Sequence, residues 1–220
     1  MILWKLAPLA IGLSVLGVLF TTTGCGSGST HARLMNAMSG ISSIDMLLDN
    51  KSSVTGVTYG AASGYVTVNR GSHNLIVEST GSSPLINQTA SFPSGDSTVL
   101  ATDSGAVVLT DNNGAPSPGN IKMRVINASP TLGTADVYIV ASGTSIAGLT
   151  PTFSNLAYQD ASGYQSLAAG SYQVIFTLPG QQFAELTSSA QSFASGQIRT
   201  AVALDAQGGG FTTAVLSDLN

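Results

Sequence analysis

The chain has 220 residues, 7 Lys+Arg against 11 Asp+Glu, a formal net charge of −4 and a single cysteine. Without a basic patch, it is not expected to bind nucleic acid. One cysteine and two histidines are too few ligands for a structural zinc site, and no internal disulfide can form. A serine nucleophile also lacks its usual G-x-S-x-G setting. We therefore expect that the protein is not an enzyme and that it binds no metal and no cofactor.

Residues 1–24 have the pattern of a lipoprotein signal peptide. Lys5 precedes an uncharged apolar run over 6–20, which is about the length of a signal core and shorter than the roughly 20 residues of a membrane-spanning helix. Small residues then lead into Thr23-Gly24-Cys25. This stretch resembles a bacterial lipobox, in which the cysteine is lipidated and the signal helix is removed. Thr22 stands where a lipobox usually has an aliphatic residue, and an ordinary signal peptide with an incidental Cys25 remains the alternative.

The lipobox resemblance predicts where the protein resides. We expect palmitate on Cys25, a flexible tether over 25–30, and the membrane as a partner through this lipid anchor. In the resembled pathway an Asp after the cysteine favours the inner membrane; Gly26 stands there. We therefore expect a cell-envelope protein of the outer membrane.

The remaining chain contains an internal repeat. Residues 33–45 (RLMNAMSGISSID) match 124–136 (RVINASPTLGTAD) at a shift of 91, and 59–65 (YGAASGY) match 158–164 (YQDASGY) at 99. Later matches keep their order while the shift grows to 101 and then 107, through insertions at expected loops. We interpret 31–113 and 121–220 as two copies of one unit, each expected to fold separately. Residues 114–120 (GAPSPGN) read as a Pro/Gly linker.

Short strands are predicted in each copy. The segments SHNLIVES (72–79) and SYQVIFTL (171–178) alternate between apolar and polar residues, and similar runs cover 32–36, 44–48, 64–68, 98–102 and 107–110. Strands of about five residues separated by Gly, Ser, Asn and Pro turns are typical of antiparallel sandwiches. The prediction is an all-β fold: two tandem immunoglobulin-like or transthyretin-like antiparallel β-sandwiches after an N-terminal signal helix.

The sequence of the second copy resembles that of a known family. Residues 109–139 (LTDNNGAPSPGNIKMRVINASPTLGTADVYI) and the later YQDASGYQSLAAGSYQVIF resemble the DUF4397 family. Its pattern is R-V-x-N/H-A-S-P, then D-V-Y, then Y-x-x-L-x-x-G-x-Y-x-V. The first copy departs from it, with Ser39 in place of the Pro and Met46-Leu47 in place of Val-Tyr. The resemblance implies a β-rich exported or envelope module of uncharacterised role and supplies no reaction.

Two charged pairs recur in both copies: Arg33 with Asp45, and Arg124 with Asp136. If the first two strands of a unit form a hairpin centred at Ser39 or Pro130, each arginine faces its aspartate across the ladder, and a two-point hydrogen bond results. The alternative leaves the arginine in solvent and uses the aspartate to accept backbone N–H groups within a loop.

The other polar residues that could carry chemistry are expected to have structural roles. His31 is placed in the tether, and His73 is read as a core or rim residue of a strand. Ser63 and Ser162, in the repeated ASGY, fit a turn before a strand, and QGGGF (207–211) fits a hairpin turn. TDSG (102–105) and TDNNG (110–114) lack the spaced carboxylates of a calcium loop.

The function predicted from these features is a non-catalytic, lipid-anchored envelope module for binding, adhesion or scaffolding. A carbohydrate-binding envelope protein is the alternative, so an envelope protein or a glycan is the expected partner. Sugars stack on exposed aromatic rings, and four tyrosines recur in pairs: Tyr59, Tyr65, Tyr158 and Tyr164. Core or edge packing of these rings is the competing explanation.

Overall fold

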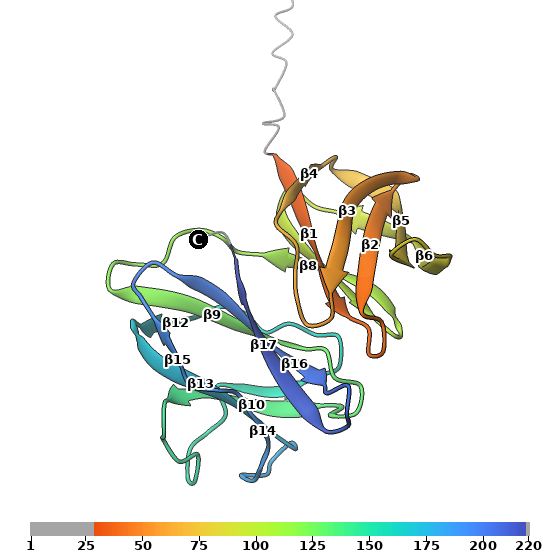
Figure 1. The fold of residues 1–220 in the computed structure, drawn as a ribbon. Coiled ribbons are helices and arrows are strands. Elements are labelled where there is room, and N and C mark those ends of the chain that lie inside the picture. The colour runs from red at the N-terminus through yellow and green to blue at the C-terminus, as the bar shows by residue number, and fades with distance from the viewer. Residues whose placement is uncertain (1–28, 219–220) are drawn as a thin grey trace, which may run out of the picture.

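The computed structural model describes residues 29–218; the signal segment and Cys25 lie outside this range. The described chain is all-β, as predicted, and forms two β-sandwich units (Figure 1). The strands of the first unit are β1 (Thr30–Ala37), β2 (Ser43–Leu48), β3 (Lys51–Thr58), β4 (Val66–Val68), β5 (Gly71–Ser79), β6 (Pro84–Phe92), β7 (Gly95–Thr102) and β8 (Gly105–Asp111). Those of the second are β9 (Asn120–Asn127), β10 (Ala135–Ala141), β11 (Phe153–Leu156), β12 (Gln165–Ala168), β13 (Gly170–Thr177), β14 (Ala184–Thr187), β15 (Gln191–Phe193), β16 (Ile198–Asp205) and β17 (Phe211–Ser217).

Each unit pairs two sheets in corresponding orders. The first unit has β4-β1-β7-β8 and β3-β2-β5-β6, and the second has β12-β9-β16-β17 and β11-β10-β13-β14, with β15 also pairing with β13. We call β4-β1-β7-β8 and β12-β9-β16-β17 the inner sheets, because they face each other across the units, and the other two the outer sheets. No helix within residues 29–218 is long and apolar enough to cross a membrane.

One pairing in each unit departs from the predicted antiparallel order. β1 pairs with β7 in parallel, and β9 pairs with β16 in parallel. The reason is that β1 does not turn back onto β2. The chain crosses instead from the inner to the outer sheet, so β1 lies beside a strand from late in the unit. Thr30, predicted as tether, begins β1, and Asn120, predicted as linker, begins β9.

A repeated asparagine holds this crossing. The Asn36 side chain donates to the carbonyl oxygens of Ile41 and Val57, both at 3.1 Å. Asn127 donates in the same way to the carbonyl oxygens of Gly133 (2.6 Å) and Leu156 (3.1 Å). Both asparagines are fully buried, so these bonds satisfy side-chain amides that solvent cannot reach. The asparagine that recurs in the sequence thus marks the place where the chain of each unit passes from the inner to the outer sheet.

The inner sheets are apolar on both faces. Along β1, Ala32 and Leu34 point into the core of their own unit, whereas Met35 and Ala37 point toward the other unit. β9 follows the same alternation. The buried residues between the units form what we call the interface cluster: Met35, Ala37, Leu100, Ile126, Ala128, Val202, Leu204 and Leu216. The two units therefore share a third apolar core.

The predicted linker is also attached to the second unit. The Nζ atom of Lys122, on β9, donates to the carbonyl and side-chain oxygens of Asn112, both at 2.9 Å, and to the carbonyl oxygen of Gly114 at 2.7 Å. Three donated bonds use the full donor capacity of an ammonium group. Lys122 therefore holds the start of the linker against β9 of the second unit.

Candidate functional site

Two arginines and two aspartates that are buried in the described chain lie between the two units. Arg33, on β1, donates from Nη2 to Asp218 Oδ1 (2.6 Å) and from Nη1 to the carbonyl oxygen of Ser217 (2.8 Å). Arg124, on β9, donates from Nη2 to Asp111 Oδ1 (2.5 Å) and from Nη1 to the carbonyl oxygen of Thr110 (3.0 Å). Each arginine is 1% exposed. Each unit therefore supplies the arginine for the other unit's aspartate.

The pairs predicted from the sequence are not formed. Because β1 and β2 lie in different sheets, Arg33 does not face Asp45, and Arg124 does not face Asp136. Asp45 accepts hydrogen bonds from Gly56 N (2.7 Å) and Thr80 Oγ1 (2.8 Å). Asp136 accepts from Asn155 N and Gly180 N, both at 2.8 Å. Each aspartate joins an edge strand of the outer sheet to a loop and accepts backbone N–H groups, as the alternative interpretation proposes. The arginines are buried, however, and not in solvent as that alternative has them.

The tyrosines that recur in the sequence complete the buried network. The Tyr65 hydroxyl donates to Asp111 Oδ2, and the Tyr164 hydroxyl donates to Asp218 Oδ2 at 2.9 Å. The guanidinium carbon of Arg33 lies 5.0 Å from the Tyr65 ring centroid, a distance at which a cation is attracted to the ring face. Arg124 lies at the same distance from Tyr164. For these two of the four recurring tyrosines, the contacts support packing as the explanation.

One threonine in each inner sheet connects an arginine of the network to an aspartate. Thr98 Oγ1 donates to Asp111 Oδ2 (2.7 Å) and accepts from Arg33 Nε (2.9 Å). Thr200 Oγ1 lies 3.0 Å from Asp218 Oδ1 and accepts from Arg124 Nε at 3.0 Å. The sequence does not predict a role for Thr98, Thr200, Asp111 or Asp218 in such a network. Asp111 and Asp218 lie in the matching VLTD and VLSD segments, which was the available signal.

Burial sets the protonation of this network. It raises the pKa of Tyr65 and Tyr164 well above the ordinary 10.0; each neighbouring arginine opposes the rise, and the carboxylates add to it. Burial by itself would lower the pKa of Arg33, but the charges of Asp218, Tyr65 and Asp111 outweigh it, so that pKa is raised. At neutral pH the phenols are neutral donors and the guanidinium stays charged.

We expect alkaline pH to loosen the chain through these phenols. A folded pKa above the unfolded value of 10.0 contributes stability that is complete below pH 10 and is lost as the pH rises further. Phenolate absorbance, followed together with circular dichroism, should show two tyrosines that ionise only as the fold melts. Tyr65→Phe and Tyr164→Phe should each remove one of them. Ionisation of all six tyrosines before unfolding would contradict the prediction.

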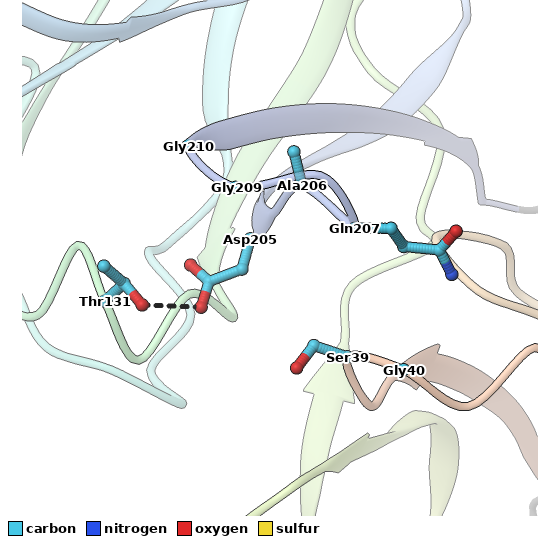
Figure 2. A pocket seen from close by; sticks show the side chains of 8 residues that line it. All are labelled: Ser39, Gly40, Thr131, Asp205, Ala206, Gln207, Gly209 and Gly210. Carbon is cyan, nitrogen blue, oxygen red and sulfur yellow. Dashed lines mark hydrogen bonds between the residues drawn. The ribbon is translucent and has the colours of Figure 1, made fainter.

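A polar hollow of about 650 Å³ opens at one end of the interface (Figure 2). The first unit lines it with Ser39 and Gly40, and the second unit lines it with Thr131 and the turn between β16 and β17. That turn spans 206–210, whereas its counterpart between β7 and β8 has only 103–104. An insertion in the second copy therefore forms much of the wall. Gly209 and Gly210 have φ of 92° and 78°, which their lack of a Cβ allows.

The carboxylate in this hollow is already occupied. Asp205 Oδ2 accepts from Thr131 Oγ1 at 2.8 Å, the contact drawn in Figure 2, and Oδ1 accepts from the Ser129 hydroxyl. Tyr59, from the other unit, donates its hydroxyl to the Asp205 backbone oxygen at 2.5 Å. Gln207 points away from Asp205 in the same view. The hollow offers an amide and hydroxyls to a ligand and no unpaired acid.

The remaining sequence candidates have structural partners. His31 lies on β1, with Nδ1 2.8 Å from Asp96 Oδ1. His73 lies at the rim of the first unit, where its Nδ1 is 2.7 Å from Asp49 Oδ2 and its Nε2 is 2.9 Å from the carbonyl oxygen of Asn69. The hydrogen bond with His73, followed by that from Asn74 N, lowers the pKa of Asp49. Within residues 29–218, neither histidine is hydrogen-bonded to a serine.

The repeated serines and the acidic turns are structural as well. Ser63 and Ser162 accept from the backbone N–H of Leu34 and Val125, at 3.0 and 2.9 Å, which ties the ASGY turn to the inner sheet. Asp111, in TDNNG, is held by Arg124. Asp103, in TDSG, accepts from Ser39 N at 3.1 Å. In the part of the chain that the structure describes, no three His, Cys, Asp or Glu residues gather as metal ligands.

The repeat, its strand order and the shared network define one module present twice. The profile of the family described as "Domain of unknown function (DUF4397)" matches residues 30–138 and 124–220. The chain belongs to the DUF4397 family. Both arginines of the buried network lie within the DUF4397 matches, and the second match contains Asp218. No curated protein matches the chain.

Solved structures resemble these DUF4397 units only distantly. The TIE protein of Bacillus anthracis has 9% identity and a TM-score of 0.28 over 84% of this chain, which spans 34% of that protein. Family 41 carbohydrate-binding modules from streptococcal virulence factors have 12% identity and a TM-score of 0.25, covering 84% of this chain and 97% of theirs. CBMbc, of family CBM26 from Eubacterium rectale Amy13K, has 12% identity and a TM-score of 0.28, covering 87% and 98%. Similarity at this level carries no argument about function.

Proposed function

We propose that this chain is a non-catalytic binding module of the cell envelope, exported by its signal helix and held in the outer membrane by lipid on Cys25. The observation that supports this proposal best is that the buried ion pairs hold the two units together. Arg33, Arg124, Asp111 and Asp218 all serve to join the two units. A rigid tandem of this kind suits presentation of a surface better than chemistry, which needs titratable groups converging on an open cleft.

The proposed anchor places the module close to the membrane. β1 begins at Thr30, five residues after Cys25, and five residues of extended chain reach at most about 18 Å. The beginning of β1 would therefore face the lipid, and the opposite end of the second unit would face outward.

Lipidation is tested by metabolic labelling. Cells supplied with radiolabelled palmitate should incorporate it into the wild-type chain and not into Cys25→Ser, since the thiol is the acceptor. Thr22→Leu, which restores the usual lipobox residue, is the matched control and should label at least as strongly as wild type. Fractionation should place the labelled chain in the outer membrane. Equal labelling of wild type and Cys25→Ser would refute the anchor.

Carbohydrate binding is the second candidate, and one observation favours it. Phe183 is an aromatic side chain that is 77% exposed, on a loop without charged residues. A glycan array probed with the folded chain distinguishes this candidate from adhesion to a protein. Turnover of any substrate in a broad ester and glycoside panel would contradict the non-catalytic proposal.

A further inference from the structure

Two insertions distinguish one end of the second unit from the first. β2 and β3 are joined by the two-residue turn Asp49-Asn50, whose φ angles of 51° and 62° are typical of a tight hairpin. The equivalent connection between β10 and β11 spans 142–152. Likewise, 80–83 join β5 and β6, whereas 178–183 join β13 and β14. We call 142–152 and 178–183 the distal loops; both lie at the end of the second unit away from the first (Figure 1).

The distal loops are fixed to each other and to the sheet. Gln182 accepts from Gly148 N through Oε1 and donates through Nε2 to the carbonyl oxygen of Leu149, both at 2.9 Å. Ile146 packs in a buried cluster with Tyr138, Val140 and Ile175 of the outer sheet. Asp136 holds the second loop through Gly180 N at 2.8 Å. These bonds prepare the surface before any ligand arrives, which lowers the entropic cost of binding.

This prepared surface presents apolar side chains to water. Phe183, Leu178 and Leu149 are 77%, 46% and 40% exposed. They account for three of the four large hydrophobic residues that are exposed in the described chain, and Leu85 of the first unit, at 43%, is the fourth. Exposed apolar groups that gather in one place mark a contact site. The hydrogen bonds that fix the distal loops leave these three side chains exposed.

The chemistry around the patch indicates its ligand. Neither distal loop contains a charged residue, and their polar groups are amides and hydroxyls. The loops themselves therefore give no electrostatic attraction to nucleic acid or anionic lipid, and the exposed charge that follows Phe183 is the acidic Glu185 on β14. Gln181, next to Gln182, is exposed, and its side chain has no hydrogen bond within residues 29–218. An open aromatic face beside a free amide fits the apolar C–H face and the hydroxyls of a sugar ring.

We propose that the distal loops bind a neutral saccharide chain, with the Phe183 ring stacking on a sugar and Gln181 bonding its hydroxyls. This inference rests on the binding function proposed above and names its ligand class. Three apolar side chains are a small area compared with the roughly 800 Å² that each partner buries in a stable protein complex. The loops also lie far from the beginning of β1, so the membrane that holds the proposed anchor does not cover them (Figure 1).

The test uses the full mature chain on an array of neutral and acidic oligosaccharides, followed by calorimetry on every hit. Neutral glycans should bind with little salt dependence, since no charge pairs form. Phe183→Ala should weaken binding about tenfold or more, as expected when the main aromatic contact is removed. Leu85→Ala removes the exposed large hydrophobic side chain of the first unit; it is the control and should bind like wild type. Gln181→Ala should weaken binding without changing the melting temperature.

Each other outcome would overturn this site. Binding that survives Phe183→Ala, but is lost on changing Gln207 in the hollow, would move the site to the interface and leave the binding function intact. Binding only to acidic glycans, or to none, would reject a neutral saccharide. Sedimentation that shows a dimer broken by Phe183→Ala would assign the patch to a second copy of the chain. Failure of palmitate labelling bears on the anchor alone.

Discussion

Replacing Asp111 with alanine should lower the free energy of unfolding by about 3–5 kcal/mol, the usual cost of removing one partner from a buried ion pair. Asp111 accepts from Arg124 of the other unit and from Tyr65 and Thr98 of its own. Without it, the Arg124 guanidinium stays buried with no carboxylate, and a phenol loses its acceptor. Urea unfolding measured by circular dichroism checks this value.

The matched control is Asp103→Ala, at the turn between β7 and β8. Asp103 is exposed and accepts from the N–H and hydroxyl of Ser39, so this change should cost much less. Double-mutant cycles then identify the partner: Arg124 should couple strongly with Asp111 and negligibly with Asp136. A large Arg124–Asp136 coupling would restore the pairing predicted from the sequence and contradict the cross-unit network.

The second unit made alone, from Gly119 to Asn220, is expected to dimerise rather than remain a stable monomer. In the full chain Arg33 meets Asp218 and Arg124 meets Asp111, so the two inner sheets present equivalent surfaces. A second copy can therefore replace the first unit by pairing Arg124 with Asp218 in a symmetric dimer. It would also re-cover the apolar residues that this unit gives to the interface cluster: Ile126, Ala128, Val202, Leu204 and Leu216.

Sedimentation over a range of concentrations measures this association. Burying each large aliphatic side chain again contributes about 1.5–3 kcal/mol, so the melting temperature should rise with protein concentration. The same fragment with Asp218→Ala is the control and should be monomeric and less stable. A monomer with a cooperative, concentration-independent transition would support the expectation, from the sequence, that each copy folds separately.

The repeat made the all-β class and the two units predictable, because matching segments fall on matching strands. It could not say which copy a residue contacts. Arg33 and Asp45 recur together because both are required in each unit, yet one bonds across the interface and the other holds a loop. The parallel pairing of β1 with β7 was equally hidden, since alternation along a strand does not name its neighbour.

The distal loops left a partial signal in the sequence. The shift between copies grows from 91 to 99 and 101, which locates the insertions. β10 and β13 are antiparallel, so the two loops leave the sheet at opposite ends. They meet because 142–152 runs back over the outer sheet, where Ile146 packs, and Gly148 then reaches Gln182. Phe183 was unselected because a single aromatic residue between a Gln-Gln pair and a short strand could equally have been buried.

The cross-unit pairs also impose an order on folding during synthesis. Arg33 and Asp218 are 185 residues apart, so the first strand finds its carboxylate only when nearly the whole chain is available. Domains usually fold from the N-terminus as they emerge, but here Arg33 has only Thr98 and the more distant Asp111 of its own unit until Asp218 arrives. Truncation at the C-terminus would therefore act first on the residues that were made earliest.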